Sequence, residues 1–305
     1  MKPDQAERRP TRPEALLPEG LSATRGARER LAIASLRVPF RVKLALVWIV
    51  IFTILGVLFA AIHFDVPWMR EHFRFIALGL PYTLIISAAA IFLAIVLALL
   101  GSLGRISKNP LTYGLSGFYV SFFRGTPLIV QLFLWYLGLG QIGANLLQSN
   151  HPWGHWLILD AFIAGILALG FNYGAYMTEI FRAGIQSVSH GQMEAAYALG
   201  MTYRQMMRRV LLPQAVRVII PPTGNEFIAM LKDSALVSFL GTSLSTMELF
   251  RRAQLAGRAD FRYLEALLLA AVMYWALTTV FQYFQGRLEH RLSKGYVRDR
   301  IVVMH

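Results

Sequence analysis

The sequence predicts an all-α integral membrane protein with about six transmembrane helices, and three observations support this. Of the 305 residues, 56% are hydrophobic and only 15% are charged, whereas a soluble domain carries about 25% charged residues. Apolar runs of roughly 20 residues, enough to cross about 30 Å of hydrocarbon, recur along the chain. The Lys and Arg residues are distributed unevenly between the two sides of the resulting topology.

Six segments are the candidate transmembrane helices. The first, Leu44–Ile62, contains no charged residue. A signal peptide is the alternative for this segment, but its flank of about 43 residues is too long for an ordinary signal peptide. We therefore interpret it as an uncleaved helix. The other candidates are Leu80–Leu103, Tyr113–Leu137, Leu157–Phe181, Val218–Leu240 and Leu264–Phe284.

The distribution of Lys and Arg predicts that both termini are cytoplasmic. With the N-terminus inside, 22 of the 30 Lys and Arg residues lie on the cytoplasmic side, as the positive-inside rule requires. Four arginines between Arg251 and Arg262 run against the rule locally. Membrane topology thus accounts for the net charge of +13, so we expect no nucleic-acid partner. Residues 1–41, which lack apolar periodicity, are expected to form a flexible basic tail that could contact anionic lipid.

Several kinds of chemistry are disfavoured by what the sequence lacks. It contains no cysteine, which removes disulfides and thiolate metal sites. No Gly-Lys dipeptide occurs, so the chain has no P-loop, and H-E-x-x-H and G-x-S-x-G are absent as well. We therefore expect a protein that is not an enzyme, with no catalytic residue, no metal ligand and no cofactor of its own.

The loop after the fourth candidate helix carries signals for two short helices. Ser189 with Gln192 fits a capping box, and so does Thr202 with the glutamine three residues later. Gly200 is placed to end the first helix, and Pro213 to limit the second. The second helix is amphipathic, which fits either a helix on lipid headgroups or a helix that docks on a protein partner.

The same loop contains a recognisable motif. It reads Glu194-Ala195-Ala196, then Gly200 after three residues, then Val-Leu-Leu-Pro ending at Pro213. This resembles the EAA motif of bacterial ABC importer permeases, with Val in place of the usual Ile. The resemblance implies that the loop docks in a groove of a separate ATPase subunit. The coupling residues it implies are Glu194, Ala195, Ala196, Gly200, Arg204 and Pro213.

The wider chain is similar to the polar amino acid permeases of the histidine/glutamine/arginine type. Five blocks carry the likeness: Gly79–Leu84, Phe122–Gln131, Ala175–Arg182, Leu212–Arg217 and Leu231–Leu236. The resemblance implies the five-helix core of an ABC type I importer, to which an extra N-terminal helix is added. Ser234-Ala235 stands where this family commonly has Thr-Ser, so no substrate preference is carried over.

The apolar segments and the family resemblance together predict the domain organisation. Residues 42–63 form the extra N-terminal transmembrane helix. Residues 78–291 form the permease domain, which includes the cytoplasmic coupling loop 186–215. Residues 292–305 form a cytoplasmic C-terminal tail.

The resemblance also implies the function and its partners. The chain would be the permease subunit of an ATP-driven importer of polar amino acids in the bacterial inner membrane. Its partners would be two copies of an ATPase subunit that hold ATP and Mg, a second permease subunit, identical or paralogous, and a periplasmic or lipid-anchored solute-binding protein. The main alternative is a secondary transporter driven by an ion gradient, against which the absence of an evident inverted repeat argues.

Charged residues inside the predicted helices mark a candidate substrate path, because each costs about 2.5–3.5 kcal/mol at the bilayer centre. Asp233 could accept hydrogen bonds from the ammonium of an amino acid, and Lys232 or Arg124 could donate to its carboxylate. Glu226 lies seven residues before Asp233 and shares its helix face. The candidate path consists of Lys232, Asp233, Glu226, Arg124, Thr83 and Thr126.

Two alternatives remain open at this stage. Arg124 could simply form an ion pair with Glu179 or Glu226 that holds helices together. Lys232 and Asp233 are adjacent and therefore point about 100° apart on a regular helix. The residues do not identify the amino acid, nor do they decide whether the permease has a specific substrate site.

Overall fold

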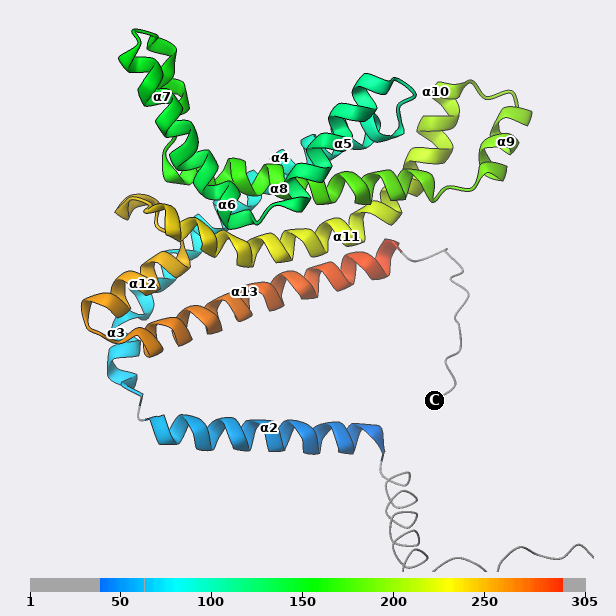
Figure 1. Ribbon diagram of the computed structural model, residues 1–305. Helices are drawn as coiled ribbons and strands as arrows, with labels where there is room; N and C mark the ends of the chain where they lie inside the picture. Colours follow the sequence, from blue (N-terminus) through cyan, green and yellow to red (C-terminus); the bar gives the residue numbers. More distant parts are fainter. Residues whose placement is uncertain (1–38, 63, 293–305) are drawn as a thin grey trace, which may run out of the picture. The chain divides into compact units, whose positions relative to one another are not determined.

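The computed structural model describes residues 39–62 and 64–292 (Figure 1). Its helices fall into two compact units, which divide after Phe64. All regular secondary structure in the described residues is helical, as the composition predicts. The predicted tails lie almost entirely outside the described residues.

The first unit contains α2 (Phe40–Ile62). Its described side chains are exposed on every side of the helix, and they are predominantly apolar. A helix that is apolar all round suits a lipid environment rather than water. Its apolar stretch is long enough to cross a membrane, which confirms the first candidate helix.

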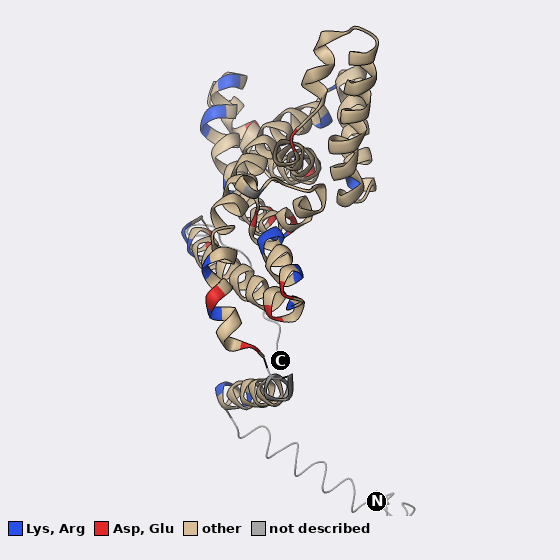
Figure 2. Cartoon of the chain, turned by 90° about the vertical axis from the view of Figure 1, so that its left-hand side faces the viewer, with Lys and Arg blue, Asp and Glu red and all other residues tan. Residues whose placement is uncertain are grey.

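The second unit is a connected series of helices. Its first half contains α3 (Val66–Ala77), α4 (Leu80–Ile106), α5 (Pro110–Gly125), α6 (Leu128–Phe133), α7 (Leu139–Gln148) and α8 (Ala161–Gln186). Its second half contains α9 (His190–Ala198), α10 (Tyr203–Met206), α11 (Leu212–Asp233), α12 (Leu249–Ala259) and α13 (Tyr263–Leu292). Figure 2 shows long helical stretches without charged residues, as expected for segments that cross a membrane.

Five helical runs of the described residues are long and apolar enough to span a membrane: Phe40–Val57, Val66–Ile106, Leu128–Gln148, Ala161–Gln186 and Tyr263–Leu292. Four of them contain or overlap closely with the first, second, fourth and sixth candidate helices.

The third candidate helix, Tyr113–Leu137, is wrong as a continuous segment. The α5 helix ends at Gly125, and the backbone is extended at Thr126 and Pro127, with ψ of 145° and 135°. Proline disfavours the helical conformation of the residue before it, so the chain breaks here and restarts as α6. The apolar run of this region is instead Leu128–Gln148.

The fifth candidate helix, Val218–Leu240, is wrong at both ends. The α11 helix starts earlier, at Leu212, and ends at Asp233, after which residues Ser234–Leu240 form a 3-10 helix. It is not among the five runs apolar enough to span a membrane on composition.

The core of the second unit lies between α4 and α8, which run side by side (Figure 1). A Cβ added to Gly101 of α4 would overlap the side chain of Thr178 of α8. Small residues let two helix backbones approach this closely in a membrane. The buried small residues of this interface include Ala90, Ala94, Ala98, Gly101, Ala164, Ala168, Gly170 and Gly174.

Candidate functional site

An open cavity of about 500 Å³ lies where α5, α6, α8 and α11 meet. It brings together four of the six predicted path residues, which come from two distant parts of the chain. Its lining consists of Arg124, Gly125, Thr126, Pro127, Leu128, Asn172, Tyr173, Tyr176, Glu226 and Asp233.

The break between α5 and α6 forms one wall of the cavity and is held by a buried amide network. Gln131 is 1% exposed, and its Nε2 donates to the Thr126 Oγ1 at 2.7 Å and to the carbonyl of Phe123 at 2.9 Å. Asn172 of α8 donates to the Gln131 Oε1 at 3.2 Å. Because a buried unpaired amide costs about 1–3 kcal/mol, this network fixes the break against α8.

Two tyrosines of α8 form another part of the lining. The Tyr173 hydroxyl donates to the Asp233 Oδ2 at 2.8 Å, and the Tyr176 ring lies 5.1 Å from the Arg124 guanidinium carbon. Sequence reasoning missed both tyrosines and Asn172. Their spacing of three and four residues on a helix otherwise rich in small residues was the available signal.

The cavity holds one guanidinium and two carboxylates. Arg124 makes a cation–π contact with Tyr176, and no carboxylate of the described residues lies within 4.0 Å of its nitrogens. The predicted pairing of Arg124 with Glu179 is wrong, because the Glu179 carboxylate pairs with Arg105 and Arg182 instead. The cavity therefore presents both acceptors for a cation and a donor for an anion.

Lys232 and Thr83 do not line this cavity. Lys232 is exposed, and because it lies next to Asp233 on α11, the two side chains point about 100° apart. Thr83 is fully buried; it donates to the carbonyl of Gly79 at 3.3 Å and accepts from the amide of Leu249 at 3.2 Å. It therefore joins α4 to α12, because its hydroxyl satisfies a backbone donor at the start of α12.

The coupling loop folds as two helices joined at Gly200. Gly200 has φ of 75°, a left-handed conformation that glycine adopts without steric cost. Its amide donates to the Tyr197 carbonyl at 2.9 Å, and the Met201 amide donates to the Ala196 carbonyl at 3.1 Å. These two bonds form a Schellman motif and end α9 as predicted.

The predicted caps of the loop have different outcomes. Thr202 and Gln205 form the expected capping box at the start of α10. Ser189 occupies the N-cap position of α9, but its side chain makes no capping hydrogen bond, so that capping box is wrong.

Pro213 does not end the second helix. The chain passes from α10 through a π-helical turn at Met207–Leu211 directly into α11. A proline lacks the amide that an α-helix requires, and the wider π turn absorbs this loss without ending the helix. The coupling loop is therefore continuous with the helix that carries Glu226 and Asp233.

The loop divides into a buried and an exposed side. Ala196 and Met206 are buried in a small cluster of their own with Val188, Leu211 and Ala215. The other predicted coupling residues are exposed: Glu194, Ala195, Gly200, Arg204 and Pro213. Three large side chains of the loop are exposed: Tyr197 of α9, Leu199 at the C-cap of α9, and Tyr203 of α10.

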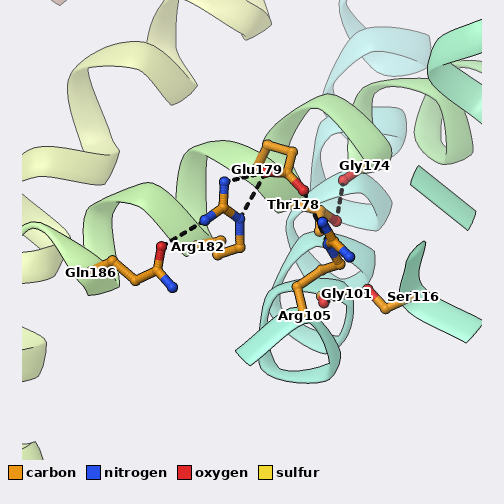
Figure 3. Close-up of polar contacts among 8 residues, drawn as sticks. All are labelled: Gly101, Arg105, Ser116, Gly174, Thr178, Glu179, Arg182 and Gln186. Carbon is orange, nitrogen blue, oxygen red and sulfur yellow. Dashed lines mark hydrogen bonds and ion pairs between the residues drawn. The ribbon is translucent and has the colours of Figure 1, made fainter. Parts of the chain in front are cut away.

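An ion network joins the end of α8 to α4 just before the coupling loop (Figure 3). The Glu179 carboxylate contacts the Arg105 Nε at 3.3 Å and the Arg182 Nη2 at 2.6 Å. Arg182 also donates to the Gln186 Oε1 at 2.6 Å. Glu179 and Arg182 form an ion pair across one helical turn, and the network ties the last turns of α8 to α4.

Comparison with known proteins identifies the family. Residues 90–294 match the family described as "Binding-protein-dependent transport system inner membrane component". The chain belongs to this family. It is therefore a transmembrane permease component of such a transport system and not its ATPase.

Individual members of the family are similar over most of the chain. The probable amino-acid permease protein YxeN of Bacillus subtilis is 38% identical over 232 residues, which cover 76% of this chain and 97% of that protein. The histidine/lysine/arginine/ornithine transport system permease protein HisQ of Escherichia coli is 35% identical and covers 72% of this chain and 94% of its own length.

Solved structures support the same fold. A crystal structure of an amino acid ABC transporter with histidines has a TM-score of 0.66 at 37% identity, and it covers 75% of this chain and 99% of that chain. An inward-facing structure of the MetNI methionine ABC transporter has a TM-score of 0.57 at 19% identity, covering 73% and 98%. The second unit therefore has the fold of ABC type I importer permeases.

Proposed function

We propose that this chain is the permease subunit of an ATP-driven importer of polar amino acids. The observation that carries the proposal is the cavity that holds Arg124, Glu226 and Asp233 together. A zwitterionic amino acid carries one carboxylate and one ammonium, and each finds an oppositely charged partner there. The relatives YxeN, a probable amino-acid permease, and HisQ, a histidine/lysine/arginine/ornithine permease, support the same substrate class.

The cavity suggests a role for each charged group. Arg124 donates to the α-carboxylate of the substrate, while Asp233, oriented by its bond from Tyr173, accepts from the α-ammonium. Glu226 is then left for a second cation on the substrate. Two carboxylates against one guanidinium favour cationic amino acids, and the Tyr176 ring offers a face to a guanidinium or imidazolium.

Uptake by the purified complex in proteoliposomes tests this proposal. Arginine, lysine and histidine should be taken up faster than glutamine, and glutamate should be the poorest substrate. Uptake should require ATP on the ATPase side. Uptake that proceeds fully without ATPase subunits would instead favour an ion-gradient carrier, and uptake of no amino acid would overturn the substrate class.

The coupling loop is the proposed ATPase-docking surface. Its exposed Tyr197, Leu199 and Tyr203 suit a groove on a protein better than water, because burial of large exposed side chains with apolar surface favours binding. Two ATPase subunits, which hold ATP and Mg, would close on ATP and draw the loops of two permeases together. This closure would switch the cavity from inward-facing to outward-facing.

The topology and the remaining partners complete the proposal. Both termini are cytoplasmic, the second permease is either a copy or a paralogue, and a solute-binding protein delivers the amino acid from outside. Because the chain contains no cysteine, single cysteines report accessibility without background. A cysteine replacing Leu199 should react with a membrane-impermeant reagent only from the cytoplasmic side. Reaction only from outside would overturn both the topology and the docking role.

A further inference from the structure

The arginines that run against the positive-inside rule separate into two pairs in the structure. Arg252 contacts the carbonyls of Met247 at 3.3 Å and Phe75 at 3.4 Å. Arg262 forms ion pairs with Asp65 at 3.1 Å and with Glu265 at 3.5 Å. These two arginines therefore hold α3, α12 and α13 together, which explains why they are tolerated.

The other two arginines, Arg251 and Arg258, have no such role. They line an open cavity of about 250 Å³ together with Gln254, Leu255 and Tyr263. They are seven residues apart, which places them on the same face of α12 about two turns from each other. Within the part of the chain that the structure describes, neither forms an ion pair.

Arg251 is moreover incompletely satisfied. Its Nε is buried without a hydrogen-bond partner among the described residues. The Glu248 carboxylate interacts electrostatically with Arg251. Its oxygens, however, already accept hydrogen bonds from the amides of Phe250 and Arg251 at 2.7 and 2.6 Å and from the Tyr274 hydroxyl at 2.8 Å. No hydrogen bond or ion pair engages the Arg251 guanidinium within the described residues, so its terminal nitrogens have no competing acceptor when a carboxylate approaches.

The opposite face of α12 is fixed in place. Leu249, Ala253, Ala256 and Gly257 are buried, and the helix packs against α3 and α13. The start of α12 is held by the double cap from Glu248. The face that carries Arg251 and Arg258 is thus presented on a rigid support, which lowers the entropic cost of binding through these side chains.

We propose that Arg251 and Arg258 form a docking site for an acidic surface of the solute-binding protein. This inference rests on the proposed function, which places α12 on the outer side of the membrane. A guanidinium pair of this kind matches carboxylates in charge and in bidentate geometry. The polar Gln254 and Tyr263 beside the pair suit a hydrated protein interface. The α12 residues of the site lie outside the five runs able to span a membrane, and Tyr263 is the first residue of the run Tyr263–Leu292.

The test is a titration of ATPase activity with the binding protein. The permease–ATPase complex in nanodiscs is titrated with its cognate binding protein loaded with arginine. For R251E/R258E, the concentration of binding protein that gives half-maximal stimulation should rise by about 10-fold or more, and its dependence on salt should weaken. R251K/R258K, which keeps both charges, should lie between this variant and the wild type.

A charge-matched control separates docking from a general effect of net charge. Arg70 and Arg74 are exposed on α3 and also lie in the predicted outer segments. R70E/R74E changes the net charge equally and should leave half-maximal stimulation unchanged. Co-elution of each variant with the ATPase subunit confirms that it folds and assembles.

Each outcome has a distinct meaning. If the wild type is stimulated and R251E/R258E responds at the same concentration, the docking site is overturned while the proposed function stands. If R251E/R258E instead changes only the dependence of activity on anionic lipid, the site binds headgroups and the inference is wrong. If no binding protein stimulates the wild type, the proposed function itself fails.

Discussion

Replacement of Gly200 separates backbone strain from lost contacts in the coupling loop. A Cβ added there meets no atom within 4 Å, so a larger side chain has room. The left-handed φ of 75° is the only structural obstacle. Substitution should therefore act through the backbone conformation that the Schellman motif requires.

The expected magnitude follows from that conformation. A left-handed backbone costs an ordinary residue about 1–2 kcal/mol, whereas asparagine adopts it more readily. If the docked loop retains this turn, Gly200→Ala should weaken ATPase binding by about 5–30-fold. Gly200→Asn should weaken it less, and Gly200→Val, which is β-branched, should weaken it most.

The measurement is the dissociation constant between the ATPase subunit and the permease reconstituted in nanodiscs. ATP-coupled uptake should fall in the same order, while the amount of permease inserted in the membrane stays constant. Equal affinities for the alanine, asparagine and valine variants would refute the argument, because they would show that docking does not depend on the left-handed turn.

Three further perturbations test other parts of the molecule. Glu179→Gln should lower thermal stability by about 1–3 kcal/mol, since Arg105 and Arg182 lose a charged acceptor; an unchanged melting temperature would count against the network. Asp233→Asn should raise the KM for arginine about 10-fold, whereas Lys232→Gln, outside the cavity, should change it little; equal effects would contradict the site. Burial raises the pKa of Glu248 to about 7, so the destabilising effect of this carboxyl should be absent below about pH 4.5 and should grow as pH rises from about 4.5 through 7. Glu248→Gln should flatten that dependence, and a wild-type profile that is already flat would refute the burial argument.

Features determined by a few neighbouring residues could be predicted from the sequence. The turn at Gly200 and the capping box of Thr202 need only the residues within one turn, so local rules identify them. The break at Thr126–Pro127 was also readable, because proline restricts the residue before it. It was missed because the average hydropathy of the surrounding segment hides a single break.

Features that depend on distant residues could not be predicted in the same way. Tyr173 orients Asp233 from 60 positions away, and only the packing of α8 against α11 brings them together. The continuation of the helix through Pro213 depends on a π turn that no simple sequence rule signals. Thr83 resembled a pore-lining hydroxyl, yet its partner is a backbone amide of α12.

The close approach of α4 and α8 limits how this subunit can move. At residues as small as Ala94 and Gly101, the backbones of α4 and α8 lie too close for one helix to slide along the other without collision. We therefore expect the two helices to move together as one rigid unit. The ion network at Glu179 holds the two helices together at the end of α8 that leads into the coupling loop. Bending is then expected where the regular hydrogen-bond ladder is already interrupted, and Thr126–Pro127, Met207–Leu211 and Pro221–Pro222 inside α11 are such places. The break at Thr126–Pro127 lines the charged cavity, whereas Met207–Leu211 lies in the coupling loop and Pro221–Pro222 lies between that loop and Glu226. A hinge at any of them would let a movement of the coupling loop change the shape of the cavity.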